Sequence, residues 1–186
     1  MALTLVKEDG TGLANANSYA SAADGDAFHE GHVWASSWTG ATTGTKESAL
    51  VMATRFIDAC YQFGGHKAND DQALQWPRAR CLDPDKWQGN PDSILDSARG
   101  SYFDDDVIPA ALKNATIEFA RELIKSDSTN APTGQGIKEF TVTGATKVVY
   151  DKKYTQPVVP RTVQLMLMKL GEYLDRKSGS VRLVRV

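Results

Sequence analysis

The residue types that could carry chemistry are few and widely spaced in this sequence. His29 and His32 lie three positions apart, a spacing that could place two imidazoles on one metal ion. No cysteine or carboxylate follows them at a matching spacing, so the pair does not predict a metal site. Asp104–Asp106 supplies three adjacent carboxylates, but no further acidic residues or glycine at calcium-loop spacing accompany them. We therefore expect no metal.

Sequence motifs of catalysis are also missing. The sequence contains no GxSxG, HExxH, CxxC or GxxxxGK[ST] pattern. Thr133–Gly136 is rich in glycine, but it neither follows a strand pattern nor opens a helix, so it reads as linker. Without convergent nucleophiles, acids, bases or cofactor motifs, we expect a protein that is not an enzyme and has no cofactor.

Composition describes an ordinary globular chain. Its 186 residues suffice for one domain with a real core, and 41% of them are hydrophobic. The net charge of −2 excludes a global basic field for nucleic acid. Cys60 and Cys81 are too few for a disulfide framework; they could pair, although reduced cysteines are favoured. Neither a signal peptide nor a membrane-spanning run is evident, so we expect synthesis in a cytoplasm.

Apolar residues at helical spacing predict the elements that must position any site. The pattern is clearest for a central helix that Thr45 caps and Gly64 ends, and for a second helix opened by Pro109. A weaker helix follows Ser18, and a last helix follows Pro160. The fold expected from these elements is mainly α, a small bundle of about four helices with an inserted β-hairpin and an extended C-terminal tail.

Within that single domain, the chain divides into segments that differ in composition and in hydrophobic pattern. β-branched and aromatic residues on both sides of Gly144 predict the hairpin, which needs a partner surface because an isolated ribbon is marginal. The expected layout is an N-terminal arm (1–17), a helical core (18–126) with a long loop (64–107), the hairpin (137–150), the last helix (157–176) and a docking tail (177–186).

Aromatic loops offer two kinds of interpretation. Trp34 and Trp38 lie in a polar loop, where they could cover the core or anchor a protein partner. The Trp76-Pro77-Arg78 loop could latch onto the bundle or contact a neighbouring subunit, since proline holds Trp76 extended. The sequence does not decide between these roles.

Several motifs in order resemble a known family. They are N-S-Y-A-S (17–21), E-S-A-L-V-M-A-T-R-F-I-D-A-C-Y (47–61), L-Q-W-P-R (74–78) and V-I-P-A-A-L-K-N-A-T-I-E-F-A (107–120). Together with the hairpin and last helix, they resemble the head-to-tail connector, or adaptor, proteins of tailed double-stranded DNA bacteriophages. The resemblance implies a structural virion protein at the head–tail junction, assembled in the host cytoplasm. It implies a ring of commonly twelve copies, bound to the portal and to the next neck protein, through which double-stranded DNA passes without specific binding.

The resemblance also nominates contact residues. The apolar, dibasic end of the chain is expected to dock on the portal, through Val181, Arg182, Leu183, Val184, Arg185 and Val186. Contacts between ring neighbours are expected from the tryptophan loop and the hairpin, through Trp76, Pro77, Arg78, Phe140, Val142, Val148 and Tyr150.

Two other functions stay open at this point. Similar sequences are sometimes labelled as resembling a primosomal DNA-binding protein, which would make this chain a single-stranded-DNA-binding protein. The four tryptophans could stack on bases, whereas the scattered Lys and Arg residues argue against a basic groove. A generic oligomeric scaffold is the third interpretation.

Overall fold

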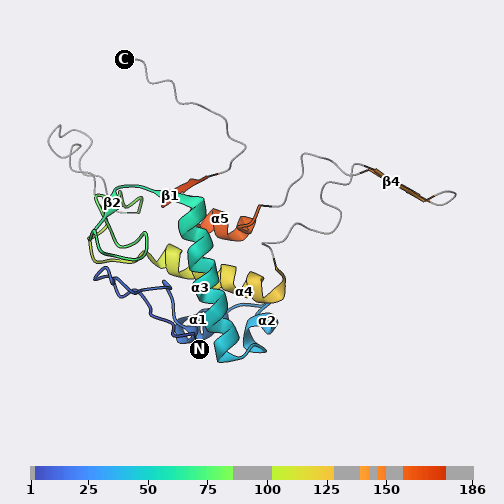
Figure 1. Cartoon of the computed structure of the whole chain (residues 1–186), viewed down its shortest axis with the longest axis horizontal. Helices are drawn as coiled ribbons and strands as arrows, with labels where there is room; N and C mark the ends of the chain where they lie inside the picture. The colour runs from blue at the N-terminus through green and yellow to red at the C-terminus, as the bar shows by residue number, and fades with distance from the viewer. Residues whose placement is uncertain (1–2, 86–101, 128–138, 143–145, 150–156, 175–186) are drawn as a thin grey trace, which may run out of the picture.

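The computed structural model describes residues 3–85, 102–127, 139–142, 146–149 and 157–174. The described part contains five helices and three two-stranded antiparallel sheets. Figure 1 shows α3 through the centre of the body, with α4 crossing it steeply. In chain order the elements are α1 (Ala22–His29), α2 (Ser36–Thr39), α3 (Thr43–Cys60), β1 (Tyr61–Phe63), β2 (His66–Lys67), β3 (Arg78–Ala79), α4 (Ala110–Lys125), β4 (Glu139–Val142), β5 (Thr146–Val149), α5 (Arg161–Leu167) and β6 (Gly171–Tyr173).

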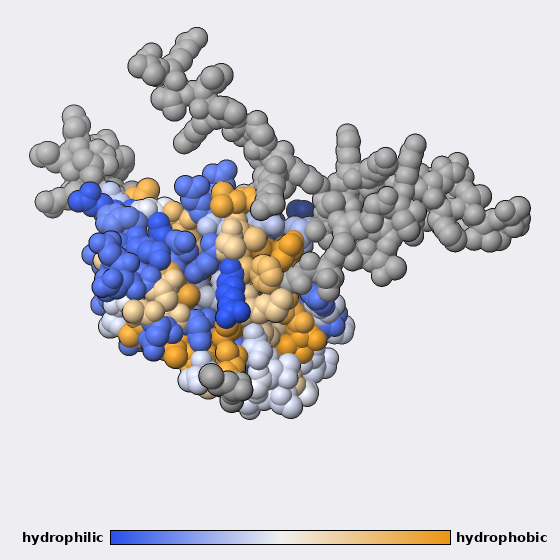
Figure 2. Space-filling view, viewed as in Figure 1, coloured by the Kyte–Doolittle hydropathy of each residue, from blue (hydrophilic) through white to orange (hydrophobic). Residues whose placement is uncertain are grey.

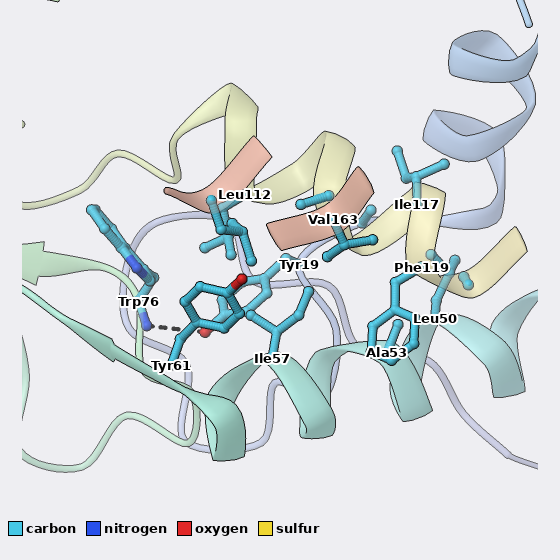
Figure 3. Close-up of a cluster of buried hydrophobic side chains, with 14 of the residues drawn as sticks. Tyr19, Leu50, Ala53, Ile57, Tyr61, Trp76, Leu112, Ile117, Phe119 and Val163 are labelled. Carbon is cyan, nitrogen blue, oxygen red and sulfur yellow. Dashed lines mark hydrogen bonds between the residues drawn. The ribbon is translucent and has the colours of Figure 1, made fainter. Parts of the chain in front are cut away.

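The central helix α3 forms as its pattern predicts, with a different start. The Thr42 side chain, not that of Thr45, caps it by accepting a hydrogen bond from the Thr45 amide. Leu50, Ala53 and Ile57 lie three to four residues apart and are fully buried. Figure 3 shows this stripe facing side chains of α4.

Helix α4 follows Pro109, as its pattern predicts, and supplies the facing half of the core. Leu112, Ala115 and Phe119 are fully buried, and the Phe119 ring lies 6.2 Å from that of Phe56 on α3. The small side chain of Ala115 allows the close approach of a neighbouring helix. Helix α4 therefore packs between α3 and α5, with extensive contacts to both.

Helix α1 begins three residues later than the sequence predicts. Ser21, not Ser18, is its cap, in a reciprocal capping box with Asp24. Gly25 in this helix is required by packing: a Cβ there would lie 2.2 Å from Trp38 Cζ2. The helix thus seats the buried Trp38 side chain, whose indole N–H donates to Asp26 at 2.8 Å.

The expected last helix over 157–176 is wrong in extent. Helix α5 covers only Arg161–Leu167, and Gly171–Tyr173 forms β6, which pairs with β1. Gly171 explains the change, because a Cβ at this position would lie 2.7 Å from the Gln62 carbonyl oxygen. The glycine lets the two backbones approach, so pairing with β1 replaces a continued helix.

The expected N-terminal arm packs against the body of the protein. Glu8 is fully buried, and its carboxylate accepts hydrogen bonds from the amides of Gly10, Gly12 and Leu13. The Leu13 carbonyl in turn accepts from the Ala73 amide at 3.0 Å. One acidic side chain thus organises a segment that its composition describes as irregular.

The mainly α bundle of about four helices is a wrong prediction, because the described fold is mixed α and β. Helix α2 has only four residues and α5 only seven. Short strands follow α3 and α5, and β2 and β3 pair with each other within the expected long loop. The hairpin is present, with β4 paired to β5 from Glu139↔Val149 to Val142↔Thr146. None of the helices in the described ranges has the length and apolar character needed to cross a membrane.

Candidate functional site

An open groove of about 520 Å³ lies at the end of the body that carries β1 and β2. The turn after β1 and the segment after β3 form one wall, and the α5–β6 connection forms the other. Figure 2 shows hydrophobic and hydrophilic residues side by side at this end. The lining consists of Gly64, Gly65, Arg80, Cys81, Leu82, Met168, Lys169, Leu170, Gly171 and Glu172.

The first wall has a constrained backbone. Gly65 has a φ of +66°, and a Cβ on it would lie 2.2 Å from the Ala79 carbonyl oxygen. Arg80 adopts a left-handed φ of 55°, which non-glycine residues rarely do. Strained backbone of this kind is concentrated at functional sites, so the exposed Arg80 side chain beside the groove is a candidate ligand contact.

The second wall presents a cation beside an apolar side chain. Met168 is 68% exposed, and Lys169 Nζ lies 2.7 Å from Asp85 Oδ1. Both members of this ion pair are largely exposed, with side-chain exposures of 62% and 74%. Such a pair contributes little to stability, so the ammonium can exchange Asp85 for a ligand anion at small cost.

An exposed aromatic ring adjoins the groove. Tyr102 forms an antiparallel bridge with Leu82, which places the two side chains on the same face. Tyr102 is 43% exposed and Leu82 is 55% exposed. The amide of the next residue, Phe103, donates to the Cys81 carbonyl at 2.9 Å, which fixes the backbone beside the tyrosine.

The charges around the groove nearly balance. Arg80 forms no ion pair with any residue that the structure describes, whereas Glu172 adds a carboxylate to the lining. Burial raises the pKa of the Cys81 thiol, which keeps it protonated and unreactive. The arrangement can therefore hold a flat apolar group between two cations, without covalent chemistry.

The Trp76-Pro77-Arg78 loop, expected at a subunit interface, lies in the interior of this chain. Trp76 and Pro77 are buried, and the Trp76 ring packs edge-on against Phe63 and Phe103. Figure 3 shows the Trp76 amide bonded to the Tyr19 hydroxyl. Arg78 is buried too and donates to backbone carbonyls, without stacking on a ring or pairing with a carboxylate in the described part.

The remaining expected contact residues are only partly described. Phe140 pairs with Val148 across the hairpin, and Val142 pairs with Thr146. The structure describes the backbone of these four residues but not their side chains. Tyr150 and Val181–Val186 lie outside the described residues.

The tryptophans divide between core and surface. Trp38 and Trp76 have no exposed surface, which removes both as stacking platforms, and Trp87 lies outside the described residues. Trp34 is 75% exposed, and buried Arg121 donates to its carbonyl at 3.2 Å.

Trp34 nevertheless lies in acidic surroundings. The same Arg121 guanidinium is bonded to Glu118 and Glu122, so two carboxylates accompany one cation beside this loop. Because both carboxylates are bonded to Arg121, this cation is not available to a phosphate. Arg80 and Lys169 at the groove are exposed, so the groove is the better candidate for an anion site.

Sequence reasoning missed the groove residues. Arg80, Leu82 and Tyr102 belong to a stretch without a clear pattern, and Met168 and Lys169 belong to the expected last helix. The strained φ of Arg80 has no sequence signal, because arginine does not favour the left-handed region. The sequence pattern does not assign the His29–His32 pair or Asp104–Asp106 as a metal site. Within the described ranges, no three His, Cys, Asp or Glu side chains are grouped to hold an ion.

Comparison with known proteins corrects the resemblance stated from the sequence. No curated protein and no solved structure matched the chain. One family model matches residues 3–186, and its description is "Putative DnaT-like ssDNA binding protein". The assignment to head-to-tail connectors is therefore wrong, and so are the virion role, the portal and neck partners and the channel for double-stranded DNA that it implied. The motifs that carried the resemblance are mostly core positions, such as Leu50, Trp76 and Leu112, and core patterns do not identify a partner. With nearly its whole length matched, the chain belongs to the family of DnaT-like single-stranded-DNA-binding proteins.

Proposed function

We propose that this protein binds single-stranded DNA in the groove between the Arg80–Leu82 segment and the Met168–Glu172 segment. The proposal is supported by the description of the family and by one structural observation: two exposed cations and two exposed apolar side chains line an open groove, and the exposed Tyr102 lies beside its Leu82 wall. It is a proposal of binding alone, with no catalytic step.

Each part of the groove matches a part of a nucleotide. A base stacks on Tyr102 and is covered by Leu82 and Met168, while neighbouring phosphates contact Arg80 and Lys169. Stacking on an aromatic ring contributes roughly 1–3 kcal/mol per base and tolerates any base sequence. Single strands expose these base faces and duplexes do not, so the groove favours the single strand.

The charge balance sets the expected strength and salt dependence. A net charge of −2 provides no long-range attraction for DNA, so affinity depends on few local contacts. Two phosphate contacts, to Arg80 and Lys169, give a slope of about −1.4 for log K against log salt concentration. A much steeper slope would contradict this geometry, because it requires more cations than the groove presents.

Fluorescence anisotropy with a labelled twelve-nucleotide single strand tests the proposal. We expect binding to weaken in Arg80→Gln and Lys169→Gln, with the slope reduced by about 0.7 in each variant. Lys125→Gln is the matched control, because Lys125 is exposed at the far end of α4. Absence of binding to the wild-type protein, tighter binding of the matching duplex, or an equal loss in Lys125→Gln would overturn the proposal.

A second pair of variants tests the stacking position. Tyr102→Ala is expected to weaken binding by about fivefold or more, because it removes the aromatic platform. Trp34→Ala removes a more exposed aromatic ring, 75% against 43%, and is expected to leave affinity unchanged. The opposite pattern would move the site to the loop before α2 and exclude the groove.

A further inference from the structure

Arg78 is a buried cation whose hydrogen bonds go almost entirely to backbone. Its side chain shows no ion pair within the described residues, and its Nη1 donates to the Gln75 carbonyl and to the Gln75 side-chain oxygen, at 3.1 and 3.0 Å. Burying a charge without a carboxylate partner is unfavourable unless several hydrogen bonds satisfy it. Burial accordingly lowers the pKa of the guanidinium from its usual value, although it stays charged.

The other hydrogen bonds of Arg78 hold one wall of the groove. Nε donates to the Gly64 carbonyl at 2.6 Å, and Nη2 donates to the Gly65 carbonyl at 2.9 Å. A third carbonyl, that of Phe63, lies 3.5 Å from Nη2. Gly64 and Gly65 both line the groove, so the guanidinium clamps this wall from the interior side.

One of the clamped glycines, Gly65, packs against the backbone of Arg80, the groove cation. A Cβ on Gly65 would lie 2.8 Å from the Arg80 carbonyl carbon, which shows how closely the two backbones pack. Arg80 has the left-handed φ of 55°, a conformation that costs a non-glycine residue free energy unless its surroundings hold it. Gly65 belongs to the surroundings that hold Arg80, and Arg78 fixes Gly65 through its hydrogen bond to the Gly65 carbonyl.

We propose that Arg78 is a positioning residue that fixes the Gly64–Gly65 wall and thereby holds Arg80 in the conformation that contacts a DNA phosphate. The inference rests on the proposed function and deepens it, by separating the cation that contacts DNA from the cation that positions it. Arginine suits the task because its planar fork offers five donors, whereas lysine offers a single ammonium that cannot bridge Gly64, Gly65 and Gln75 together.

A double-mutant cycle on DNA affinity, with Arg78→Lys and Arg80→Gln in the full chain, tests the coupling. Arg78→Lys is expected to weaken binding about tenfold while the salt slope stays unchanged, because the phosphate contact is still made but is no longer pre-organised. Arg80→Gln is expected to lower the slope, and the double variant to bind as weakly as Arg80→Gln alone. Additive losses, or a lower slope in Arg78→Lys, would overturn the positioning role.

A second measurement does not depend on DNA. Backbone ¹⁵N relaxation of the free protein is expected to show greater motion at Gly64, Gly65 and Arg80 in Arg78→Lys, with α3 unaffected. Unchanged relaxation at all three residues would overturn the inference even if DNA binds. Failure of the wild-type protein to bind DNA, with the loosening observed, would overturn the proposed function and the DNA-contacting half of this inference, and would leave Arg78 as a clamp of the fold.

Discussion

The Tyr19 hydroxyl donates a 2.6 Å hydrogen bond to Asp58 Oδ1, joining the segment before α1 to the buried side of α3. The Tyr19 oxygen also accepts from the Trp76 amide, and Asp58 Oδ2 accepts from the Gln75 amide. Two polar side chains thus position the tryptophan loop within the core, and one of them, that of Asp58, is a carboxyl group.

Asp58 gives the first prediction. Burial raises the pKa of its carboxyl from 3.8 to about 6, although bonds from Tyr19 and Gln75 and the charges of Lys67 and Arg78 oppose the shift. Between pH 4 and 6 the folded state therefore binds more protons than the unfolded state, so this group makes stability fall as pH rises, by up to about 3 kcal/mol. Asp58→Asn should abolish this contribution, as urea unfolding at a series of pH values would reveal.

His29 gives the second prediction, with the opposite sign. Burial lowers the pKa of its imidazole from 6.5 to about 4, so between these values the unfolded state binds the additional proton. This group makes stability rise with pH across nearly the window in which Asp58 makes it fall. The contributions of Asp58 and His29 to wild-type stability should hence nearly cancel from pH 4 to 6.

The two variants separate these opposing contributions. Stability should rise with pH in Asp58→Asn and fall with pH in His29→Gln over the same window. Parallel profiles for the two variants would contradict both assignments.

Gly25 gives the third prediction, where helix propensity and packing disagree. Propensity alone predicts that Gly25→Ala stabilises α1 by about 1 kcal/mol. The new Cβ would lie 2.2 Å from the fully buried Trp38 ring, and overpacking a core of this kind costs roughly 1–3 kcal/mol. Since the indole is rigid and held by Asp26, the packing cost should exceed the propensity gain, and we expect a net loss of up to about 2 kcal/mol in thermal or urea unfolding.

Gly31 supplies the matched control for that substitution. No atom lies within 4 Å of a Cβ built there, and its φ is not positive. Gly31→Ala is expected to be neutral or slightly stabilising. An equal loss in both variants would mean that backbone conformation, and not Trp38, determines the need for glycine.

Glu172 gives the fourth prediction, because it places a carboxylate in a groove proposed to take phosphates. Glu172→Gln should tighten single-stranded DNA binding by about twofold at low salt, and the gain should shrink as salt screens the repulsion. Glu30→Gln, at the exposed end of α1, should have no effect in the same anisotropy titration. Weaker binding in Glu172→Gln would indicate that the carboxylate is a DNA contact.

Local patterns explain which parts of the fold could be predicted. The stripes around Leu50 and Leu112 repeat at helical spacing and bury against each other, so α3 and α4 follow from the sequence alone. The end of α5 does not, because Gly171 is required by the Gln62 carbonyl, which is remote in sequence. Tyr61 similarly begins a strand only because Tyr173 is opposite it.

The candidate site was less predictable than the fold. Arg80 and Lys169 face one groove only through the β1–β6 pairing and the left-handed turn at Arg80, and neither is visible in local composition. The sequence allowed a role for the tryptophan loop at a subunit interface, because Pro77 extends the chain at Trp76. In the structure, the Tyr19–Asp58 pair bonds the backbone of this loop, and the Trp76 ring is buried in the core.

The pairing of β1 with β6 also determines when strand β1 can be completed during synthesis of the chain. Strand β1 follows α3 directly, but its partner emerges from the ribosome only after most of the remaining residues have been synthesised. Until then α3 and α4 can pack, while Tyr61 and Phe63 keep an open strand edge that invites association with other chains. Any pause in translation before Gly171 would prolong that exposure, so aggregation during synthesis should increase when the codons just ahead of β6 are slow.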